Sequence, residues 1–249
     1  MTVKRYTEKT MLRILFSTFF VILTALTQVS AADYFSLPPD AVNVGPVTQA
    51  KADKISADLF QLYFLEAFQK TQKPMMIQIE WEKPYFGAGV AEEDGPLIAV
   101  KIFGGMIRMP EMTEDILAAV ICHEIGHVIG GAPYQDVIGA EWTSVEGQSD
   151  FFAASKCLPQ YFHILQPTLT KEELKRKIEL VGLGFFLIMH KYFSPLQPPV
   201  SLEKTAPEVA TELNRHSYPS DQCRLDTFKA GAACLTEATC RAPVCWLPR

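Results

Sequence analysis

The stretch Ala118–Gly131 reads AAVICHEIGHVIGG and contains the pattern H-E-x-x-H. In a helix, His123 and His127 lie four residues apart on one face, with Cβ atoms about 6 Å apart, so that both imidazoles can reach one metal ion. Glu124 is offset by one residue and can address a water bound to that ion. The stretch therefore predicts a metal-binding helix with a carboxylate beside the metal.

The flanking residues favour a buried helix. Thr113, followed by two acidic residues, is typical of a helix N-cap, and Gly130-Gly131 is a stop signal. Apolar side chains recur at helical spacing at Ile116, Leu117, Val120, Ile121, Ile125, Val128 and Ile129. Glu124 is the one charged residue between Asp115 and Asp136. The plain alternative is a coincidence, in which both histidines form hydrogen bonds inside a core.

The third metal ligand separates the classes of metallopeptidase. A metzincin continues as H-x-x-G-x-x-H, but the last position here is Pro133, which cannot ligate. The candidate is Glu146, with Asp150 four residues later on the same helix face. Glu146 would bind the metal, while Asp150 accepts the N–H of a ligating histidine. Thr143-x-x-Glu146 also fits a capping box, in which Glu146 only satisfies a backbone amide, and this alternative stays open.

The two motifs, His123-Glu-x-x-His127 and Glu146-x-x-x-Asp150, resemble the gluzincin zinc peptidases, most of all the HtpX and CAAX-prenyl-protease group. The resemblance covers about Ile98 to Gly231. The chain lacks that group's membrane-spanning helices, so the likeness is closer to the soluble, exported bacterial members of the group. It implies an α+β, zincin-like domain with a small, mostly antiparallel sheet packed on the metal helix and one Zn²⁺ per chain. It also implies a protein or peptide substrate held as an added antiparallel strand on the sheet edge. The plain alternative is that the strands only form core.

The same group has a His-Pro segment followed by an arginine in this region of the chain. Here His216 and Pro219 are separated by two residues, and Arg224 follows. The resemblance implies that His216 lies near the zinc and stabilises the oxyanion, while Arg224 supports the carboxylates of the site. A lone loop histidine is more often simply solvated, and the inserted residues blur the alignment.

The remaining elements follow from periodicity. The pattern predicts a helix and three strands ahead of the metal helix, at Lys51–Lys70, Met75–Trp81, Pro96–Phe103 and Met106–Met109. Gly104-Gly105 would form the hairpin turn between the last two strands. Thr170-x-x-Glu173 is a capping box that opens a long helix ending near Phe193.

Residues 1–32 are typical of a secretory signal peptide. A basic start precedes the uncharged run Ile14–Leu26, and Val29–Ala32 supplies small residues for cleavage. The run is short for a membrane span, and an uncleaved anchor is the alternative, so contact with a membrane would involve this segment alone. The sequence predicts an exported protein, periplasmic or secreted, with a metallopeptidase domain at 33–231.

Six cysteines in an exported protein indicate disulfides, with fifteen connectivities if all of them pair. The disulfide candidates are Cys157, Cys223, Cys234, Cys240 and Cys245. Cys122, inside the metal helix, either pairs or serves as a small buried hydrophobe. Residues 232–249 form a cysteine-rich tail, expected to pack on the same domain.

The composition fits an ordinary globular domain, with 249 residues, 48% hydrophobic side chains and a formal net charge of −5. An acidic chain without basic clusters is a poor candidate for binding nucleic acid. The predicted activity is that of a zinc endopeptidase with Glu124 as general base. The rival hypotheses are a non-catalytic envelope binding or chaperone-like module with a structural zinc, and a peptidase kept latent by its own tail.

Overall fold

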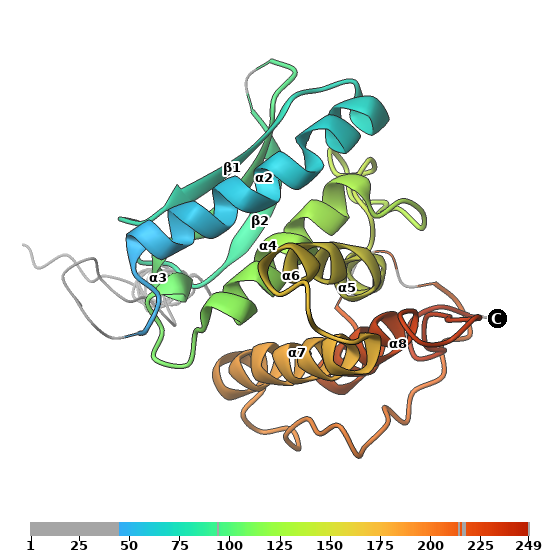
Figure 1. Ribbon diagram of the computed structural model, residues 1–249. Helices are drawn as coiled ribbons and strands as arrows, with labels where there is room; N and C mark the ends of the chain where they lie inside the picture. The colour runs from blue at the N-terminus through green and yellow to red at the C-terminus, as the bar shows by residue number, and fades with distance from the viewer. Residues whose placement is uncertain (1–44, 94, 214, 216–217, 249) are drawn as a thin grey trace, which may run out of the picture. The chain divides into compact units, whose positions relative to one another are not determined.

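A small sheet and two helices that pack on it form the N-terminal part of the structure, a computed structural model that describes residues 45–93, 95–213, 215 and 218–248 (Figure 1). The strands are β1 (Met75–Glu80), β2 (Ala88–Glu92) and β3 (Ile98–Phe103), in the order β1-β3-β2. The predicted signal peptide at 1–32 lies outside the described residues. The α+β class predicted from the sequence is confirmed.

The sheet is mixed rather than mostly antiparallel. β1 pairs with β3 in parallel, with Met75 opposite Ile98, and β2 pairs with β3 in antiparallel, with Ala88 opposite Ile102. The central strand β3 is nearly continuously apolar, and four of its six residues are fully buried, which suits a strand with partners on both sides. β2 is the edge strand next to α4 (Glu114–Ile129), the helix that carries His123 and His127 and that the sequence predicts to bind a metal.

The predicted strand at Met106–Met109 is wrong, and so is the predicted turn. Gly104–Ile107 is a short helix, α3, and the hairpin instead joins β2 to β3. A Cβ on Gly104 would lie 1.8 Å from the carbonyl oxygen of Trp81, and one on Gly105 would lie 1.9 Å from that of Pro84. These two glycines therefore allow other backbone segments to approach closely. In the sequence, such a Gly-Gly pair looks the same as one that forms a hairpin turn.

Helices make up the rest of the described chain. They are α2 (Gln49–Thr71), α4 (Glu114–Ile129), α5 (Glu146–Phe152), the π-helical turn η2 (Ala153–Cys157), α6 (Leu158–Leu165), α7 (Lys171–Phe193) and α8 (Asp221–Ala233). The predicted helix at Lys51–Lys70 is confirmed as α2, and the capping box of Thr170 and Glu173 begins α7 as predicted. α8 was not predicted, because its buried face includes Arg224, Asp226 and Thr227 and shows no apolar periodicity.

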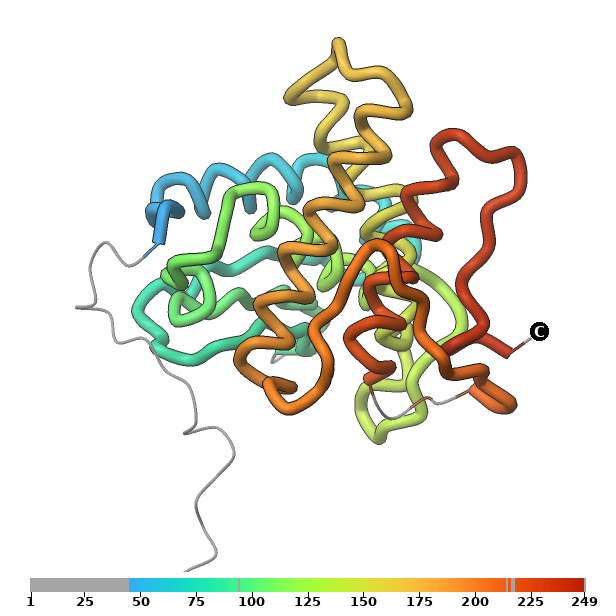
Figure 2. Tube along the Cα trace, turned by 90° about the horizontal axis from the view of Figure 1, so that it is seen from below, coloured from blue at the N-terminus to red at the C-terminus, as the bar shows by residue number. Residues whose placement is uncertain are grey.

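α7 and α8 lie side by side below the metal helix (Figures 1 and 2). α8 also contacts α5 and η2, where a Cβ on Gly231 would meet the side chain of Ala154 at 2.7 Å. Because Gly231 has no side chain, α8 packs closely against η2 and also against α5, the helix that carries Glu146. Among the described residues, no helix has both the length and the apolar character that crossing a membrane requires.

All six cysteines are described and form three disulfides, Cys122–Cys157, Cys223–Cys245 and Cys234–Cys240. The first joins the metal helix to η2, so Cys122 is paired. The other two hold the tail, which returns beside the segment preceding α8, where Ala210 N donates to the Val244 carbonyl at 2.8 Å (Figure 2). Trp246 packs in a cluster with Val145, Ala206 and Cys223, immediately before α5 begins.

Candidate metal centre

The metal helix presents three polar side chains inside the core. Thr113 caps α4 by accepting a hydrogen bond from Ile116 N at 3.2 Å, and fourteen of the helix's sixteen residues are buried. His123, Glu124 and His127 are only 4%, 6% and 7% exposed. Because burying polar groups is costly unless they are paired, these three residues require partners from neighbouring elements.

α5 supplies the first partner. The helix begins at Glu146 with Val145 as N-cap, while the Thr143 hydroxyl donates instead to the Ala140 carbonyl at 2.7 Å. The capping-box alternative for Glu146 is therefore wrong. The Glu146 carboxylate faces the two histidines, with Oε2 at 3.1 Å from His123 Nε2 and Oε1 at 3.5 Å from His127 Nε2.

Two glycines allow α5 to sit this close. A Cβ on Gly126 of α4 would lie 2.8 Å from the backbone of Ser149, so the crossing of α4 and α5 requires glycine there. A Cβ on Gly147 would lie 2.3 Å from the indole of Trp246. The tail therefore packs against α5 at Gly147, and the close approach between α4 and α5 occurs at Gly126.

The ligand atoms converge as metal ligands do. His123 Nε2 and His127 Nε2 are 3.1 Å apart, and both of them and a Glu146 oxygen lie within 4.8 Å of one another. Ligands about 2.0–2.2 Å from a tetrahedral zinc are separated from one another by about 3.3 Å. The Glu146 carboxylate lies 3.1 Å from His123 Nε2 through Oε2 and 3.5 Å from His127 Nε2 through Oε1, and with the 3.1 Å between the two nitrogens these separations fit ligands of one ion.

The second nitrogen of each histidine fixes its tautomer. His127 Nδ1 lies 2.7 Å from the Ser144 carbonyl, and His123 Nδ1 lies 2.8 Å from Asp150 Oδ1. Both partners only accept hydrogen bonds, so in each neutral ring the hydrogen sits on Nδ1 and Nε2 carries a lone pair. Two lone pairs and a carboxylate then face one another, an arrangement that a cation stabilises. The residues present therefore fit a metal ion.

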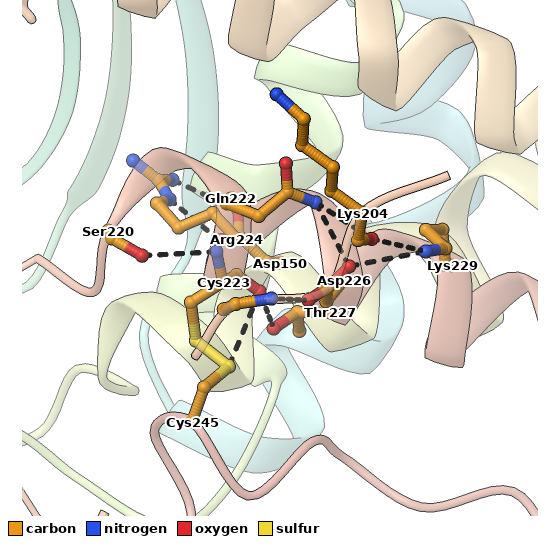
Figure 3. The surroundings of a disulfide bond; sticks show 11 residues. Asp150, Lys204, Ser220, Gln222, Cys223, Arg224, Asp226, Thr227, Lys229 and Cys245 are labelled. Carbon is orange, nitrogen blue, oxygen red and sulfur yellow. Dashed lines mark hydrogen bonds and ion pairs between the residues drawn. A yellow bond between two sulfur atoms is a disulfide. The ribbon is translucent and has the colours of Figure 1, made fainter. Parts of the chain in front are cut away.

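Asp150 and Arg224 support this group from behind. Arg224, on α8, holds Asp150 through two bonds, Nε to Oδ2 at 2.7 Å and Nη2 to Oδ1 at 3.0 Å (Figure 3). Its Nη2 also lies 3.5 Å from Glu146 Oε2. Burial disfavours the Asp150 carboxylate, but Arg224 and His123 outweigh burial and hold its pKa below the usual value. The ion pair fixes the carboxylate that orients His123.

The surroundings shift the pKa values of the four titratable side chains of the site in different directions. Burial raises the pKa of Glu124 to about 7, where a carboxylate can both accept and release a proton. Burial lowers the pKa of His127 to about 4, which keeps it neutral and able to ligate. Burial also opposes a charge on His123, yet Asp150 and Glu146 raise its pKa to about 10, so this position favours positive charge. His123 and His127 lower the pKa of Glu146 despite its burial.

A cavity of about 280 Å³ opens over these ligands. Its walls include His123, Glu124, His127 and Glu146 on the helix side and Ala88–Val90 of edge strand β2 opposite. None of the described tail residues lines this cavity, so the hypothesis of a tail covering the cleft gains no support. A molecule in the cavity would lie between the edge strand and the ligands.

Some site residues were not identified from the sequence. Ser144 contacts His127 through its backbone carbonyl, which no side-chain pattern reveals. Tyr218 borders the cavity, and Glu146 raises the pKa of its phenol to about 12, with burial adding to the effect. Arg224 places its guanidinium 5.2 Å from the Tyr218 ring centroid. His216 lies outside the described residues, so its predicted role stays a prediction.

Comparison with known proteins returns no match. No protein family matches the chain, and neither a curated protein nor a solved structure matches it. The structure itself shows a His-His-Glu group on two helices that could hold a metal ion.

Proposed function

We propose that this protein is a zinc-dependent endopeptidase of the gluzincin type, similar to exported relatives of the HtpX group. One observation carries the proposal: three ligand atoms, from His123, His127 and Glu146, converge while Glu124 stands free of the ligand set at the same cavity. A site with three protein ligands keeps a position for water, which is how catalytic zinc sites differ from closed structural ones.

The chain's own residues perform the following steps. His123, His127 and Glu146 would hold the ion, and Asp150, held by Arg224, keeps the ring of His123 in its ligating tautomer. When bound, zinc supplies a Lewis acid that activates water and polarises a carbonyl. Glu124 takes a proton from the attacking water while the oxygen of that water bonds to the peptide carbonyl carbon. It then gives that proton to the nitrogen as the C–N bond breaks.

The three disulfides indicate an oxidising environment outside the cytoplasm. Together with the sequence of residues 1–32, this supports export to the cell envelope or beyond. We place the substrate among proteins or peptides in that compartment, because an extended chain can add to the edge of β2 beside the ligands. Nucleic acid is not among the expected partners.

The test is metal content by plasma mass spectrometry together with hydrolysis of a quenched peptide mixture. Wild type and Glu124→Gln should each carry one zinc per chain, while Glu146→Ala should carry none. Glu141→Gln, in the exposed loop before α5, is the matched control and should keep both zinc and activity. Glu124→Gln should lose at least about 100-fold in kcat because it removes the general base.

Two results would overturn the proposal. Zinc retained in full by Glu146→Ala would remove Glu146 from the ligand set. A wild-type protein that binds zinc stoichiometrically yet cleaves peptides no faster than Glu124→Gln would favour the non-catalytic module with a structural zinc.

A further inference from the structure

α5 begins at Glu146 without the side-chain cap that commonly fixes the start of a helix. Its N-cap is Val145, an apolar residue, and no side chain forms a capping hydrogen bond there. The helix has seven residues, which is about two turns, and a helix of this length is not stable alone in water. Contacts with other elements therefore determine where the Glu146 carboxylate lies.

The indole of Trp246, in the C-terminal tail, is packed against the start of α5. A Cβ on Gly147 would lie 2.3 Å from the indole, so the ring rests directly on the helix backbone there. Val145, the other chain neighbour of Glu146, belongs to the same buried cluster as Trp246. Ser149, whose backbone meets α4, follows Gly147 by two residues and thus faces about 200° away around the helix. The tail and α4 therefore hold α5 from opposite sides.

The ring of Trp246 contributes packing rather than a hydrogen bond. Its side chain belongs to a residue that is 6% exposed, and Nε1 has no hydrogen-bond partner among the residues that the structure describes. A buried indole used as a donor would have such a partner. A phenylalanine at this position would therefore keep an aromatic ring on Gly147 and lose no hydrogen bond to a described residue.

A disulfide ties Trp246 to the other support of the site. Cys245, the preceding residue, is bonded to Cys223 in the first turn of α8 (Figure 3). The residue after Cys223 is Arg224, which holds the Asp150 carboxylate through two hydrogen bonds. One turn of α8 thus carries both the anchor of the tail and the guanidinium that supports the metal centre.

We propose that Trp246 is a positioning residue of the metal centre, and that the disulfide Cys223–Cys245 keeps it in place. The indole holds α5 against α4, so that Glu146 stays at the two histidines as the third ligand. The proposal rests on the proposed zinc site. It gives the tail a role opposite to latency, because loosening the tail should weaken metal binding rather than raise peptidase activity.

The experiment measures the zinc affinity of the full chain, with its disulfides intact, by competition with a chelator. It also records the visible spectrum after Co²⁺ replaces zinc, since absorption by Co²⁺ depends on the number and geometry of its ligands. Trp246→Ala should bind zinc about 10- to 100-fold more weakly than wild type, as expected when the support of a ligand is lost. Its Co²⁺ spectrum should also change, and Trp246→Phe should restore both readouts.

Two controls separate positioning from a general loss of stability. Phe162→Ala removes a fully buried ring of α6 that does not line the metal cavity. It should lower the melting temperature and leave the zinc affinity and the Co²⁺ spectrum unchanged. Trp246→Leu keeps apolar volume without the flat ring, and it is the second test variant should circular dichroism show that Trp246→Ala is unfolded.

The disulfide is tested through its coupling to Trp246. Cys223→Ala/Cys245→Ala should weaken zinc binding, and adding Trp246→Ala to this pair should weaken it little further, because both changes act through the same ring. Cys234→Ala/Cys240→Ala is the matched control, since that disulfide closes a separation of six residues and lies outside the cluster around Trp246. Its zinc affinity should equal that of wild type.

The outcomes separate this proposal from the proposed function. Wild-type zinc affinity in folded Trp246→Ala, an equal loss in Phe162→Ala, or higher peptidase activity in Trp246→Ala would overturn the positioning role and leave the metal centre in place. Fully additive losses from the disulfide and from Trp246 would overturn the part given to Cys223–Cys245. Zinc retained by Glu146→Ala would instead overturn the third ligand itself.

Discussion

At the scale of single residues, the candidate site brings carboxylates close to two histidines. Glu124 and Asp150 are buried, and the Glu146 carboxylate faces both histidines. Arg224 pairs with Asp150 and lies 3.5 Å from Glu146, and Arg215 lines the same cavity. Since buried charge is unfavourable unless it is paired, a divalent cation at the two histidines would stabilise Glu146 in this position. Burial is the largest cause of the raised pKa of Glu124, and Glu146 adds to it.

Asp150→Asn should destabilise the fold and weaken the metal site together. Asp150 is fully buried, and its loss of charge leaves the Arg224 guanidinium with only the more distant Glu146 carboxylate as a counterion. We expect a loss of about 3–5 kcal/mol in the free energy of unfolding, and a metal affinity 10- to 100-fold lower. Chemical denaturation and metal competition titration measure the two effects. Asp226→Asn on α8 is the control, and its metal affinity should be unchanged. Equal losses of metal affinity in both variants would contradict the role given to Asp150.

At the scale of elements, the site depends on how α5 crosses α4. Glu146 can reach His123 and His127 only because Gly126 lets the backbone of Ser149 approach α4. The tail supports the other side of α5 through Trp246, which stacks where Gly147 has no side chain. The position of Glu146, the third candidate ligand, is thus set by packing on both faces of one short helix.

Gly126→Ala should displace α5. Its Cβ would meet Ser149 backbone atoms at 2.8 Å, and backbone cannot move aside as a side-chain end can. We expect a stability loss of about 1–3 kcal/mol and a clear drop in zinc affinity. In Gly184→Ala on α7, the Cβ meets only the flexible end of Ile116 at 2.9 Å, and alanine favours the helix by about 1 kcal/mol. Differential scanning calorimetry with zinc titration compares the two; normal zinc affinity in Gly126→Ala would refute the packing argument.

At the scale of the whole molecule, the disulfides join the parts that build the site. Cys122–Cys157 links the metal helix to η2, and Cys223–Cys245 links α8, the helix of Arg224, to the tail beside Trp246. The site is therefore assembled from α4, α5 and α8, which covalent bonds and one apolar cluster keep in register.

Removing Cys122–Cys157 should cost more stability than removing Cys234–Cys240. The first closes a sequence separation of 35 residues and the second one of 6. Loop-closure entropy predicts losses of about 4 and about 2 kcal/mol respectively for the double alanine variants. Guanidinium denaturation followed by circular dichroism measures both. A larger loss in Cys234→Ala/Cys240→Ala would show that loop entropy does not govern their stability.

Local patterns in the sequence predicted several features correctly. The spacing of His123 and His127, the cap at Thr113 and the capping box at Thr170 depend on neighbours within four residues, so helix geometry alone determines them. The long helix α2 and the strand β1 were predicted for the same reason. Disulfide bonding was predicted from the even number of cysteines and is confirmed, whereas the predicted signal peptide at 1–32 lies outside the described residues and stays a prediction.

Tertiary structure decided the rest. β2 is short, partly exposed and has the sequence Ala-Gly-Val-Ala-Glu, so only its pairing with β3 makes it a strand. Gly104-Gly105 suggests a turn in the sequence, but in the structure these glycines make room for the backbone of Trp81 and Pro84. The sequence by itself determined the metal helix and offered Glu146 as either cap or ligand. The crossing of α5 over α4 turned its carboxylate toward the histidines, because that choice depends on contacts between residues far apart in the chain.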